Sequence, residues 1–268
     1  MREDEAVAFQ RDYCLPPTNS TTASLTAAWN EARARIQPLR GTLDPDLRPL
    51  SQDGQRVAGE ISGAPNFTLV FGNAPLIFAS LKVDGLLAVQ KFVDCNFTDE
   101  LAAPDSTNEG EVLRFCMRAN PIDIPMVGQD GQVTFSSPYS QNLVPASLTF
   151  NQISESEIQV IATIISRPNY MQVAQIGNMF VLTNGYHRAV ALKKAGHERI
   201  PCIVRGYADL NAAGLPPPGF FDMGHLSSPR PPLVADLIEP TSLARLEVRA
   251  KNHILRVGLQ VGQFDAPR

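Results

Sequence analysis

The chain lacks the sequence patterns that identify the commonest catalytic and cofactor-binding sites. It contains no Gly-x-x-x-x-Gly-Lys-Ser/Thr phosphate loop, no Gly-x-Gly-x-x-Gly, no Gly-x-Ser-x-Gly and no His-Glu-x-x-His. The motifs of P-loop proteins, Rossmann dinucleotide sites, serine-hydrolase elbows and zincin metal sites are therefore missing. Any functional site has to be inferred from a different pattern.

Cysteine is scarce and widely spaced. The four cysteines stand at positions 14, 95, 116 and 202, with no Cys-x-x-Cys pair and no histidine at zinc-ligand spacing. The sequence therefore predicts no metal site. Spread cysteines in a chain of this length are typical of free, partly buried thiols in a reducing compartment, so we expect a cytoplasmic protein.

Long apolar runs and a strong excess of either charge are also missing. No segment approaches the ~20 apolar residues that span a bilayer, and the charged start, Met1–Glu5, does not resemble a signal peptide. The formal net charge of −4, from 23 basic and 27 acidic residues, is not typical of nucleic-acid binding. We therefore expect neither a membrane nor a nucleic acid as partner, and homo-oligomerisation stays open.

The composition is that of a globular protein with a sizeable core. The 268 residues are 44% hydrophobic and 19% charged, and the 22 prolines and 18 glycines indicate many turns. Residues 1–20 are charged and then Pro-rich, which predicts a flexible arm. Residues 21–36 show a helical apolar period, and residues 40–66 are typical of a loop.

A β-rich region is expected to complete the N-terminal part, 21–147. Short apolar runs separated by turn residues predict strands. These runs are 67–71, 76–79, 86–92, 112–117 and 132–135. At the other end, residues 207–268 read as a Pro-rich extension. Apolar residues alternate with other residue types over 255–261 there, which predicts a C-terminal strand.

The central segment, 148–206, has the clearest local signals. Ser154 and Glu157 have the Ser-x-x-Glu spacing of a capping box, which predicts a helix to about Ser166. Glu155 and Glu157, in the first turn of that helix, are interpreted as helix-start acids rather than as catalytic groups. Next come a hairpin of 171–176 with 179–183 around Gly-Asn, a helix over 186–195 that ends before a glycine, and a strand over 200–204.

The turn between the second hairpin strand and the helix carries the strongest chemical signal. It reads Asn184-Gly185-Tyr186-His187-Arg188. A glycine permits a sharp turn, the first N–H groups of a helix favour an anion, and a guanidinium stands beside them. The sequence therefore predicts an anion site at this turn. The alternative for His187 is a histidine that caps its own loop.

This order of elements resembles the ParB/sulfiredoxin superfamily, whose members carry Gly-x-(His/Arg)-Arg-x-x-Ala at the same place. The resemblance covers roughly 148–206 and implies an α+β fold with a ParB/sulfiredoxin-like core. It also implies that Gly185 to Arg188 cradle nucleotide phosphates, with ATP or CTP and Mg²⁺ as the candidate ligands. In sulfiredoxins the preceding helix presents Lys, Ser and Thr, where this chain has Ser156, Gln159 and Thr163, so Thr163 joins the expected phosphate site.

The chain departs from each branch of that superfamily at a residue that carries chemistry. Tyr186 replaces the nucleophilic cysteine of sulfiredoxins, and a phenol cannot replace a thiolate in that reaction. Asn184 replaces the aspartate common in the free serine kinases, and an amide is not a base. Partition ParB proteins carry Gly-Glu-Arg-Arg followed by helix-turn-helix segments, where this chain continues into its Pro-rich extension.

The sequence therefore predicts a cytosolic protein that binds a nucleotide or another phosphorylated small molecule at the Asn184–Arg188 turn. Whether it is an enzyme stays open, and an enzyme of this type would be a phosphotransferase or nucleotide hydrolase, with its catalytic residues unidentified. The first alternative is a small-molecule kinase that uses ATP. The second is a non-catalytic protein in which the motif joins strand to helix or nucleotide acts as a switch. A DNA-binding module is the least favoured.

Overall fold

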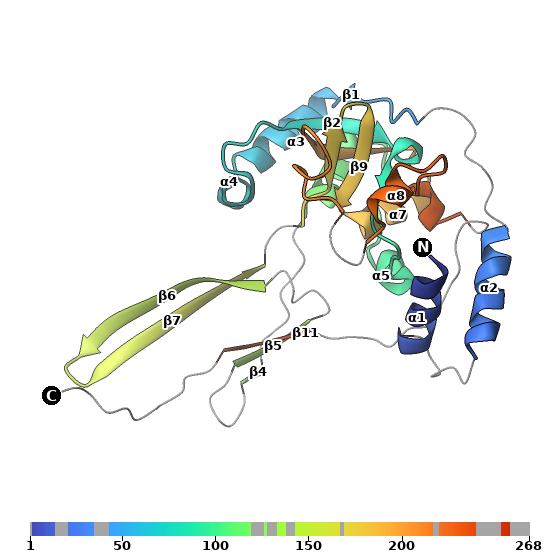
Figure 1. The fold of residues 1–268 in the computed structure, drawn as a ribbon. Coiled ribbons are helices and arrows are strands. Elements are labelled where there is room, and N and C mark those ends of the chain that lie inside the picture. The colour runs from blue at the N-terminus through green and yellow to red at the C-terminus, as the bar shows by residue number, and fades with distance from the viewer. Residues whose placement is uncertain are drawn as a thin grey trace. The chain divides into compact units, whose positions relative to one another are not determined.

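The computed structural model divides the chain into two compact units (Figure 1). Unit 1 comprises Met1–Arg118 and Asn169–Arg249, and unit 2 comprises Ala119–Pro168 and Ala250–Arg268. The residues that the structure describes are 2–13, 21–34, 43–118, 126–127, 133–137, 143–166, 169–216, 220–239 and 253–257. The expected core segment 148–206 is thus shared between the two units.

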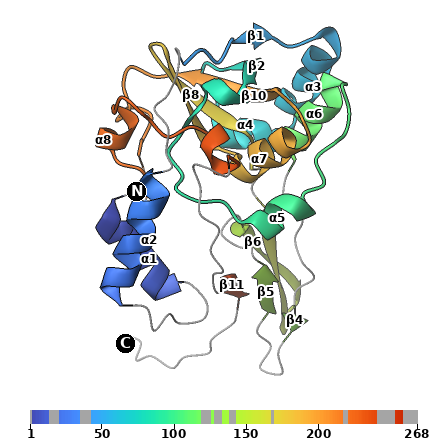
Figure 2. The same cartoon turned by 90° about the vertical axis from the view of Figure 1, so that its right-hand side faces the viewer.

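Unit 1 contains a mixed sheet and a set of helices (Figure 2). Its helices are α1 (Glu3–Tyr13), α2 (Thr22–Ala34), α3 (Gln52–Ser62), α4 (Pro65–Phe71), α5 (Cys95–Glu100), α6 (Glu109–Met117), α7 (Tyr186–Lys194) and α8 (Met223–Leu226), with 3-10 turns η1 (Val83–Gly85) and η3 (Ala235–Leu237). Within the described ranges, every helix is too short or too polar to traverse a lipid bilayer.

The sheet of unit 1 has the order β1-β2-β10-β8-β9-β3. Its strands are β1 (Arg48–Pro49), β2 (Ile77–Lys82), β3 (Leu87–Ala88), β8 (Gln172–Ile176), β9 (Met179–Asn184) and β10 (Arg199–Gly206). β10 runs parallel to β8 and antiparallel to β2, while β3 runs parallel to β9. The core packs on this sheet, with Leu81, Leu182 and Ile203 fully buried.

The segment around the motif folds as its sequence predicts. β8 and β9 form an antiparallel hairpin in which Ile176 pairs with Met179 across the Gly177-Asn178 turn. Helix α7 follows, and Gly196 adopts the left-handed conformation (φ +89°) just beyond it. Strand β10 then returns to the sheet beside β8. The strand, turn, helix and strand predicted over 171–204 are confirmed.

The prediction of a β-rich N-terminal region is wrong, because helices dominate residues 3–118. The run 112–117 lies in α6, which begins where the Asn108 side chain accepts a hydrogen bond from the Glu111 N–H at 3.1 Å. The run 67–71 lies in α4, and α3 occupies the predicted loop 40–66. The predicted strand 76–79 is confirmed within β2. The α+β class itself is confirmed.

Two further N-terminal predictions are tested by the helices. The flexible arm predicted for residues 1–20 is wrong for Glu3–Tyr13, which form α1, and 14–20 lie outside the described residues. The helix predicted over 21–36 is confirmed as α2 over Thr22–Ala34, and 35–36 lie outside the described residues.

The expectation of free thiols is confirmed for Cys95, Cys116 and Cys202, whereas the fourth cysteine lies outside the described residues.

Unit 2 is built from strands alone in its described part. One sheet has the order β11-β5-β4, from β11 (His253–Val257), β5 (Val133–Ser137) and β4 (Met126–Val127). The other is an antiparallel hairpin of β6 (Leu143–Ser154) and β7 (Glu157–Ser166). The strands predicted over 132–135 and 255–261 are confirmed within β5 and, as far as Val257, within β11.

The helix predicted from Ser154 to Ser166 is wrong. Ser154 pairs with Glu157 across a two-residue turn, so the Ser-x-x-Glu spacing marks a hairpin and not a capping box. The Ser154 hydroxyl accepts a hydrogen bond from the Ser156 N–H at 3.3 Å, a local turn contact. The following β-branched residues fit a strand, because branching at Cβ favours extended backbone.

A main-chain hydrogen bond joins the two places at which the chain leaves unit 1 and returns to it. The chain departs after Arg118 and returns at Asn169. On the return side, the Met171 N–H donates to the Cys116 carbonyl at 3.1 Å. The end of α6 and the beginning of β8 are therefore joined directly, although fifty or so residues separate them along the chain.

Candidate functional site

The motif turn depends on Gly185, which is the N-cap of α7. This residue has φ +96°, in the region that side chains rarely adopt. A Cβ at this position would lie 3.0 Å from Cγ and 3.1 Å from Cα of Met171. The Asn184 side-chain oxygen accepts the Gly185 N–H at 2.8 Å. Both the backbone conformation and the packing therefore require glycine between β9 and α7.

Tyr186 points into the core of unit 1. Its side chain is buried, and its hydroxyl donates to the Leu182 carbonyl and accepts the Val89 N–H at 2.8 Å. Burial raises the pKa of the Tyr186 phenol far above its usual value, although the Val89 N–H works against that shift. The phenol therefore stays neutral and joins β9 to the segment after β3.

His187 is half-buried and contacts the beginning of α5. Its Nε2 atom accepts the Asp94 N–H at 3.0 Å, and its ring lies 4.9 Å from the Phe97 ring between centroids. A ring nitrogen that accepts a hydrogen bond belongs to a neutral imidazole with its proton on Nδ1. Burial lowers the pKa of His187, and Arg188 adds to that effect, whereas Asp94 opposes it. His187 is therefore a neutral contact between α7 and α5.

Arg188 is the most deeply buried charged side chain of the motif, with 4% of its surface exposed. Its Nη1 atom donates to the carbonyls of Phe115, Cys116 and Arg118, at 3.4, 2.5 and 3.3 Å. These carbonyls belong to the last turn of α6 and the residue after it, where main-chain carbonyls lack helical N–H donors. The negative end of the α6 dipole therefore faces the guanidinium.

The Arg188 charge is held without a carboxylate partner in the described part of the chain. Burial lowers its pKa to about 10, with the Arg118 charge adding to the effect and the Cys116 thiol opposing it. The side chain therefore remains protonated at neutral pH. Its Nη2 atom is buried and has no hydrogen-bond partner among the described residues. A buried donor of this kind is costly unless another group pairs with it.

The first turn of α7 leaves main-chain donors available. The first helical hydrogen bond of α7 runs from the Ala189 N–H to the Gly185 carbonyl at 2.9 Å. The N–H groups of Tyr186, His187 and Arg188 donate to no acceptor within the described ranges. These groups point along the helix axis towards its positive end, which is the arrangement that favours an anion.

Thr163 and the two glutamates of the predicted helix are not part of this arrangement. Thr163 lies in β7 of unit 2, opposite Ser147, with its side chain exposed. Glu155 lies in the hairpin turn, and Glu157 begins β7. Since the predicted helix is a strand, the argument that placed Thr163 beside the phosphates fails. The expected site is thereby reduced to the turn Asn184–Arg188 within unit 1.

The partners of the motif lie far from it in the sequence and were missed by sequence reasoning. Val89 and Asp94 lie between β3 and α5, while Phe115, Cys116 and Arg118 lie at the end of α6. The contacts are made mostly by main-chain atoms, so these residue types carry no signal of the role. Asp94 is the exception, because its carboxylate caps α5 by accepting the Phe97 N–H at 3.1 Å, and a capping aspartate can be read from sequence.

No family model, curated protein or solved structure matches the chain. The geometry of the turn and the sequence pattern therefore carry the functional interpretation.

A cavity also lies elsewhere in unit 1. It has a volume of about 800 Å³ and is lined by residues of β1, the starts of α3 and α6, and the segment before β10. Its charged groups are largely used internally: Arg199 binds Asp46 at 2.9 Å, and the Ser51 N–H donates to Glu109 at 2.5 Å. Among the described residues, no three His, Cys, Asp or Glu side chains gather as a metal site would require.

Proposed function

We propose that unit 1 binds a nucleotide or another phosphorylated small molecule at the N-terminus of α7 and does not transform it chemically. The observation that carries the proposal is the set of three N–H groups, Tyr186 to Arg188, without an acceptor in the described part of the chain. Gly185 creates the turn at which these N–H groups lack an acceptor, and the buried positive charge of Arg188 lies in the same helix turn. Both features favour an anion there.

The side chains of the motif support binding over catalysis. Phosphoryl transfer needs a base near the acceptor hydroxyl and a carboxylate that holds the metal. The Tyr186 phenol is buried and neutral, the His187 Nε2 atom already accepts the Asp94 N–H, and Asn184 offers only an amide. The motif therefore supplies no free base, which disfavours the alternative of a small-molecule kinase.

The arrangement of β8, β9, α7 and β10 keeps the ParB/sulfiredoxin resemblance as part of the proposal. The glycine turn, the helix that follows and the returning strand stand in the order that the resemblance implies. ATP and CTP, with or without Mg²⁺, are accordingly the first ligands to test. The helix that carries the lysine in sulfiredoxins has no counterpart at 154–166, because these residues form a hairpin turn and β7.

A second candidate function is structural, and one observation favours it. Arg188 donates to three carbonyls at the end of α6, and Tyr186 and His187 contact two other segments of unit 1. The motif would then hold α5, α6 and β3 around α7 in a non-catalytic interaction protein. The two candidates differ in one measurable property, which is the affinity of the turn for phosphate groups.

The test is calorimetric titration of the full chain with ATP, ADP, CTP, GTP and inorganic phosphate, with and without Mg²⁺. The decisive variant is Asn184→Asp, which keeps the acceptor of the Gly185 N–H and adds a negative charge beside the proposed anion. We expect it to weaken binding about tenfold, which corresponds to about 1.4 kcal/mol. The matched control is Asn178→Asp, the same change at the exposed Gly177-Asn178 turn, which should bind as the wild type does.

The outcomes separate the candidates. Binding by the wild type that Asn184→Asp weakens and Asn178→Asp does not supports an anion at the α7 N-terminus. No binding by any of the five ligands rejects the proposal and leaves the structural candidate. Release of ADP in the presence of an added hydroxylated acceptor would instead establish the kinase and contradict the absence of turnover.

A further inference from the structure

The motif turn contains the only asparagine in the chain that is followed by glycine, Asn184-Gly185. The main-chain nitrogen of a residue can attack the side-chain amide of an asparagine before it, which converts that amide into a carboxylate. Glycine hinders this attack least, because it has no Cβ. The geometry of the turn, the freedom of its groups and the charges around it all bear on this reaction.

The attacking nitrogen and the carbon that it attacks lie close together. The Gly185 nitrogen is 2.8 Å from the Asn184 side-chain oxygen, and a C=O bond is about 1.2 Å long, so this nitrogen lies within about 4.0 Å of Cγ. Atoms that are ready to react are about 3–3.5 Å apart. Rotation of the side-chain amide about its Cβ–Cγ bond turns the face of the carbonyl towards the nitrogen and closes the remaining gap.

The main chain is not fixed at the attacking nitrogen. The Gly185 N–H donates to the Asn184 side chain, and the first hydrogen bond of α7 is made by the Ala189 N–H. The pairing of β8 with β9 is irregular beside the turn, with a register shift between Gln172 and Val173. Ring closure therefore breaks no helical hydrogen bond and no regular sheet hydrogen bond at this nitrogen.

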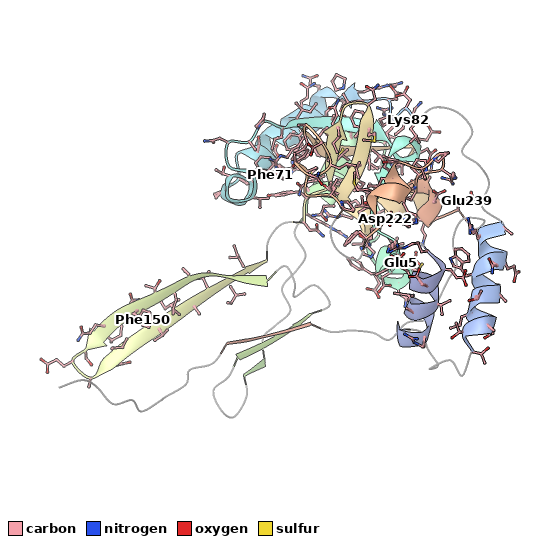
Figure 3. All side chains as sticks on the ribbon, viewed as in Figure 1. Glu5, Phe71, Lys82, Phe150, Asp222 and Glu239 are labelled. Carbon is pink, nitrogen blue, oxygen red and sulfur yellow. The ribbon has the colours of Figure 1, made fainter. Side chains whose placement is uncertain are left out.

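The amide group of Asn184 can leave, and water can reach it. Its NH2 group donates to no acceptor in the described part of the chain. The side chains of unit 1 gather around its sheet, as Figure 3 shows, and Gly185 is buried there, but Asn184 is only half-buried. Ammonia therefore has a route to solvent, and water has the same route for the second step.

The positive end of α7 favours the charges that form during the reaction. Loss of the Gly185 proton and attack on Cγ both place negative charge just before the helix. The N–H groups of Tyr186 and His187 lack acceptors within the described ranges and lie at this end of the helix dipole. Fixed donors at a developing negative charge lower the barrier of a reaction. An unfolded Asn-Gly pair lacks this help.

We propose that Asn184 is a self-modification site, at which the side-chain amide becomes a carboxylate. The Gly185 nitrogen loses its proton and bonds to Cγ, the bond from Cγ to Nδ2 breaks, and ammonia leaves with the proton. The product is a succinimide ring. Water opens it at Cγ to give aspartate, or at the main-chain carbonyl carbon to give isoaspartate. One water is consumed and one ammonia is released, and no oxidant takes part.

The conversion changes the charge of the proposed anion site. The new carboxylate stands one residue before the N-cap of α7 and interacts with the same positive helix end as a phosphate does. Isoaspartate also adds a methylene to the main chain between β9 and α7. The affinity for phosphate therefore falls as the protein ages. This consequence rests on the proposed function, whereas the conversion itself does not.

The experiment follows the asparagine amides of the full chain by peptide mass spectrometry during incubation in mildly alkaline buffer. The folded chain is compared with the chain unfolded in guanidinium chloride. We expect Asn184 to convert at least as fast in the folded chain, because only there does α7 assist. Asn178, which is exposed and followed by Met179, should keep its amide. Asn184→Gln is the matched control, because its longer side chain requires a larger ring, and it should not convert.

Two results would overturn the inference. One is a folded chain that keeps Asn184 while the unfolded chain converts it, because the fold would then protect the amide. The other is equal conversion of Asn178 and Asn184 in the folded chain. Titration of fresh and aged protein with inorganic phosphate tests the consequence separately. Aged protein that has converted Asn184 and binds as fresh protein does would contradict it, whereas fresh protein that binds none would reject the proposed function alone.

Discussion

The Nη1 atom of Arg188 donates a hydrogen bond to the main-chain carbonyl of Cys116, which lies 72 residues earlier in the chain. This contact joins the positive end of α7 to the negative end of α6, so one side chain bridges two helix termini of opposite sign. It also explains how a guanidinium remains charged in the interior with no carboxylate partner among the described residues. The orientation of α7, and therefore of the proposed anion site, depends on it.

Replacing this side chain should lower the stability of unit 1 substantially. In Arg188→Met the carbonyls of Phe115 and Arg118 lose this donor, while the Cys116 carbonyl keeps the Met171 N–H, and we expect a loss of about 2–4 kcal/mol in the free energy of unfolding. Arg114→Met removes an exposed arginine of α6 that pairs with Glu60, and should cost less than about 1 kcal/mol. Urea unfolding followed by circular dichroism measures both. Equal midpoints would show that the buried contact contributes nothing.

The Tyr186 hydroxyl should stabilise unit 1, because it accepts a hydrogen bond from a buried main-chain N–H group. Tyr186→Phe keeps the ring in the core but leaves the Val89 N–H without its acceptor, which should cost about 1–2 kcal/mol. Tyr207→Phe, at a half-buried ring outside the motif, should change stability by less than about 0.5 kcal/mol. Thermal unfolding of the two variants measures the contrast. A Tyr186→Phe variant as stable as the wild type would contradict a stabilising role of the hydrogen bond between Tyr186 and Val89, the residue after β3.

Protonation of His187 should weaken the fold below neutral pH. Burial lowers its folded-state pKa, so the unfolded chain binds the proton more readily. The stability associated with neutral His187 is complete above the unfolded pKa of about 6.5 and is lost as the pH falls through the lower, folded value. Urea midpoints of wild type and His187→Gln, measured between about pH 8 and pH 5, should diverge at pH 8 and converge towards pH 5. Parallel pH profiles of the two proteins would refute this assignment.

The two glycines at the ends of α7 should respond differently to the same substitution. Gly185 and Gly196 both have positive φ, at +96° and +89°, so alanine strains either one by roughly 1–2 kcal/mol. Only at Gly185 would the new Cβ also press on Met171, whereas nothing lies within 4 Å at Gly196. We therefore expect Gly185→Ala to lose more stability than Gly196→Ala, by about 1 kcal/mol or more. Equal losses would mean that Met171 yields without cost.

The parts of the fold that could be predicted from the sequence are those set by nearest neighbours. Gly177, Gly185 and Gly196 each mark a turn whose backbone conformation only glycine adopts easily, and all three have positive φ. These residues fix the boundaries of β8, β9 and α7 without reference to the rest of the chain. The anion-favouring turn was found for the same reason, because its N–H groups and its arginine lie within five consecutive residues.

Predictions failed where one pattern fits two structures. The residues from Ile158 to Ile165 satisfy helical spacing, but β-branched side chains make up most of them, and this composition favours a strand. Conversely, 112–117 looked like a short apolar strand because it was considered without Asn108, the residue that caps α6. Weighing branching and the preceding cap would have corrected both assignments.

The environment of the site could not be predicted, because it is built from main-chain atoms of distant segments. The carbonyls of Phe115 and Cys116 and the N–H groups of Val89 and Asp94 contact the motif, and every residue type except proline has both groups. The residue types at those positions therefore do not indicate the contact. Only the folded arrangement of α6 and the segment after β3 reveals that Tyr186, His187 and Arg188 have partners inside unit 1.

The hydrogen bond between Met171 and Cys116 has a consequence for how this chain can change. This bond joins the end of α6 to the residue before β8 directly. The segment between Arg118 and Asn169 is therefore an insertion that the sheet of unit 1 does not require. Lengthening such an insertion has a small cost in loop-closure free energy, roughly 0.6 kcal/mol for each doubling of its length. The hairpin of β6 and β7 can therefore be altered, replaced or shortened by design without displacing Gly185 and α7. The same position in the chain is suited to the insertion of another domain.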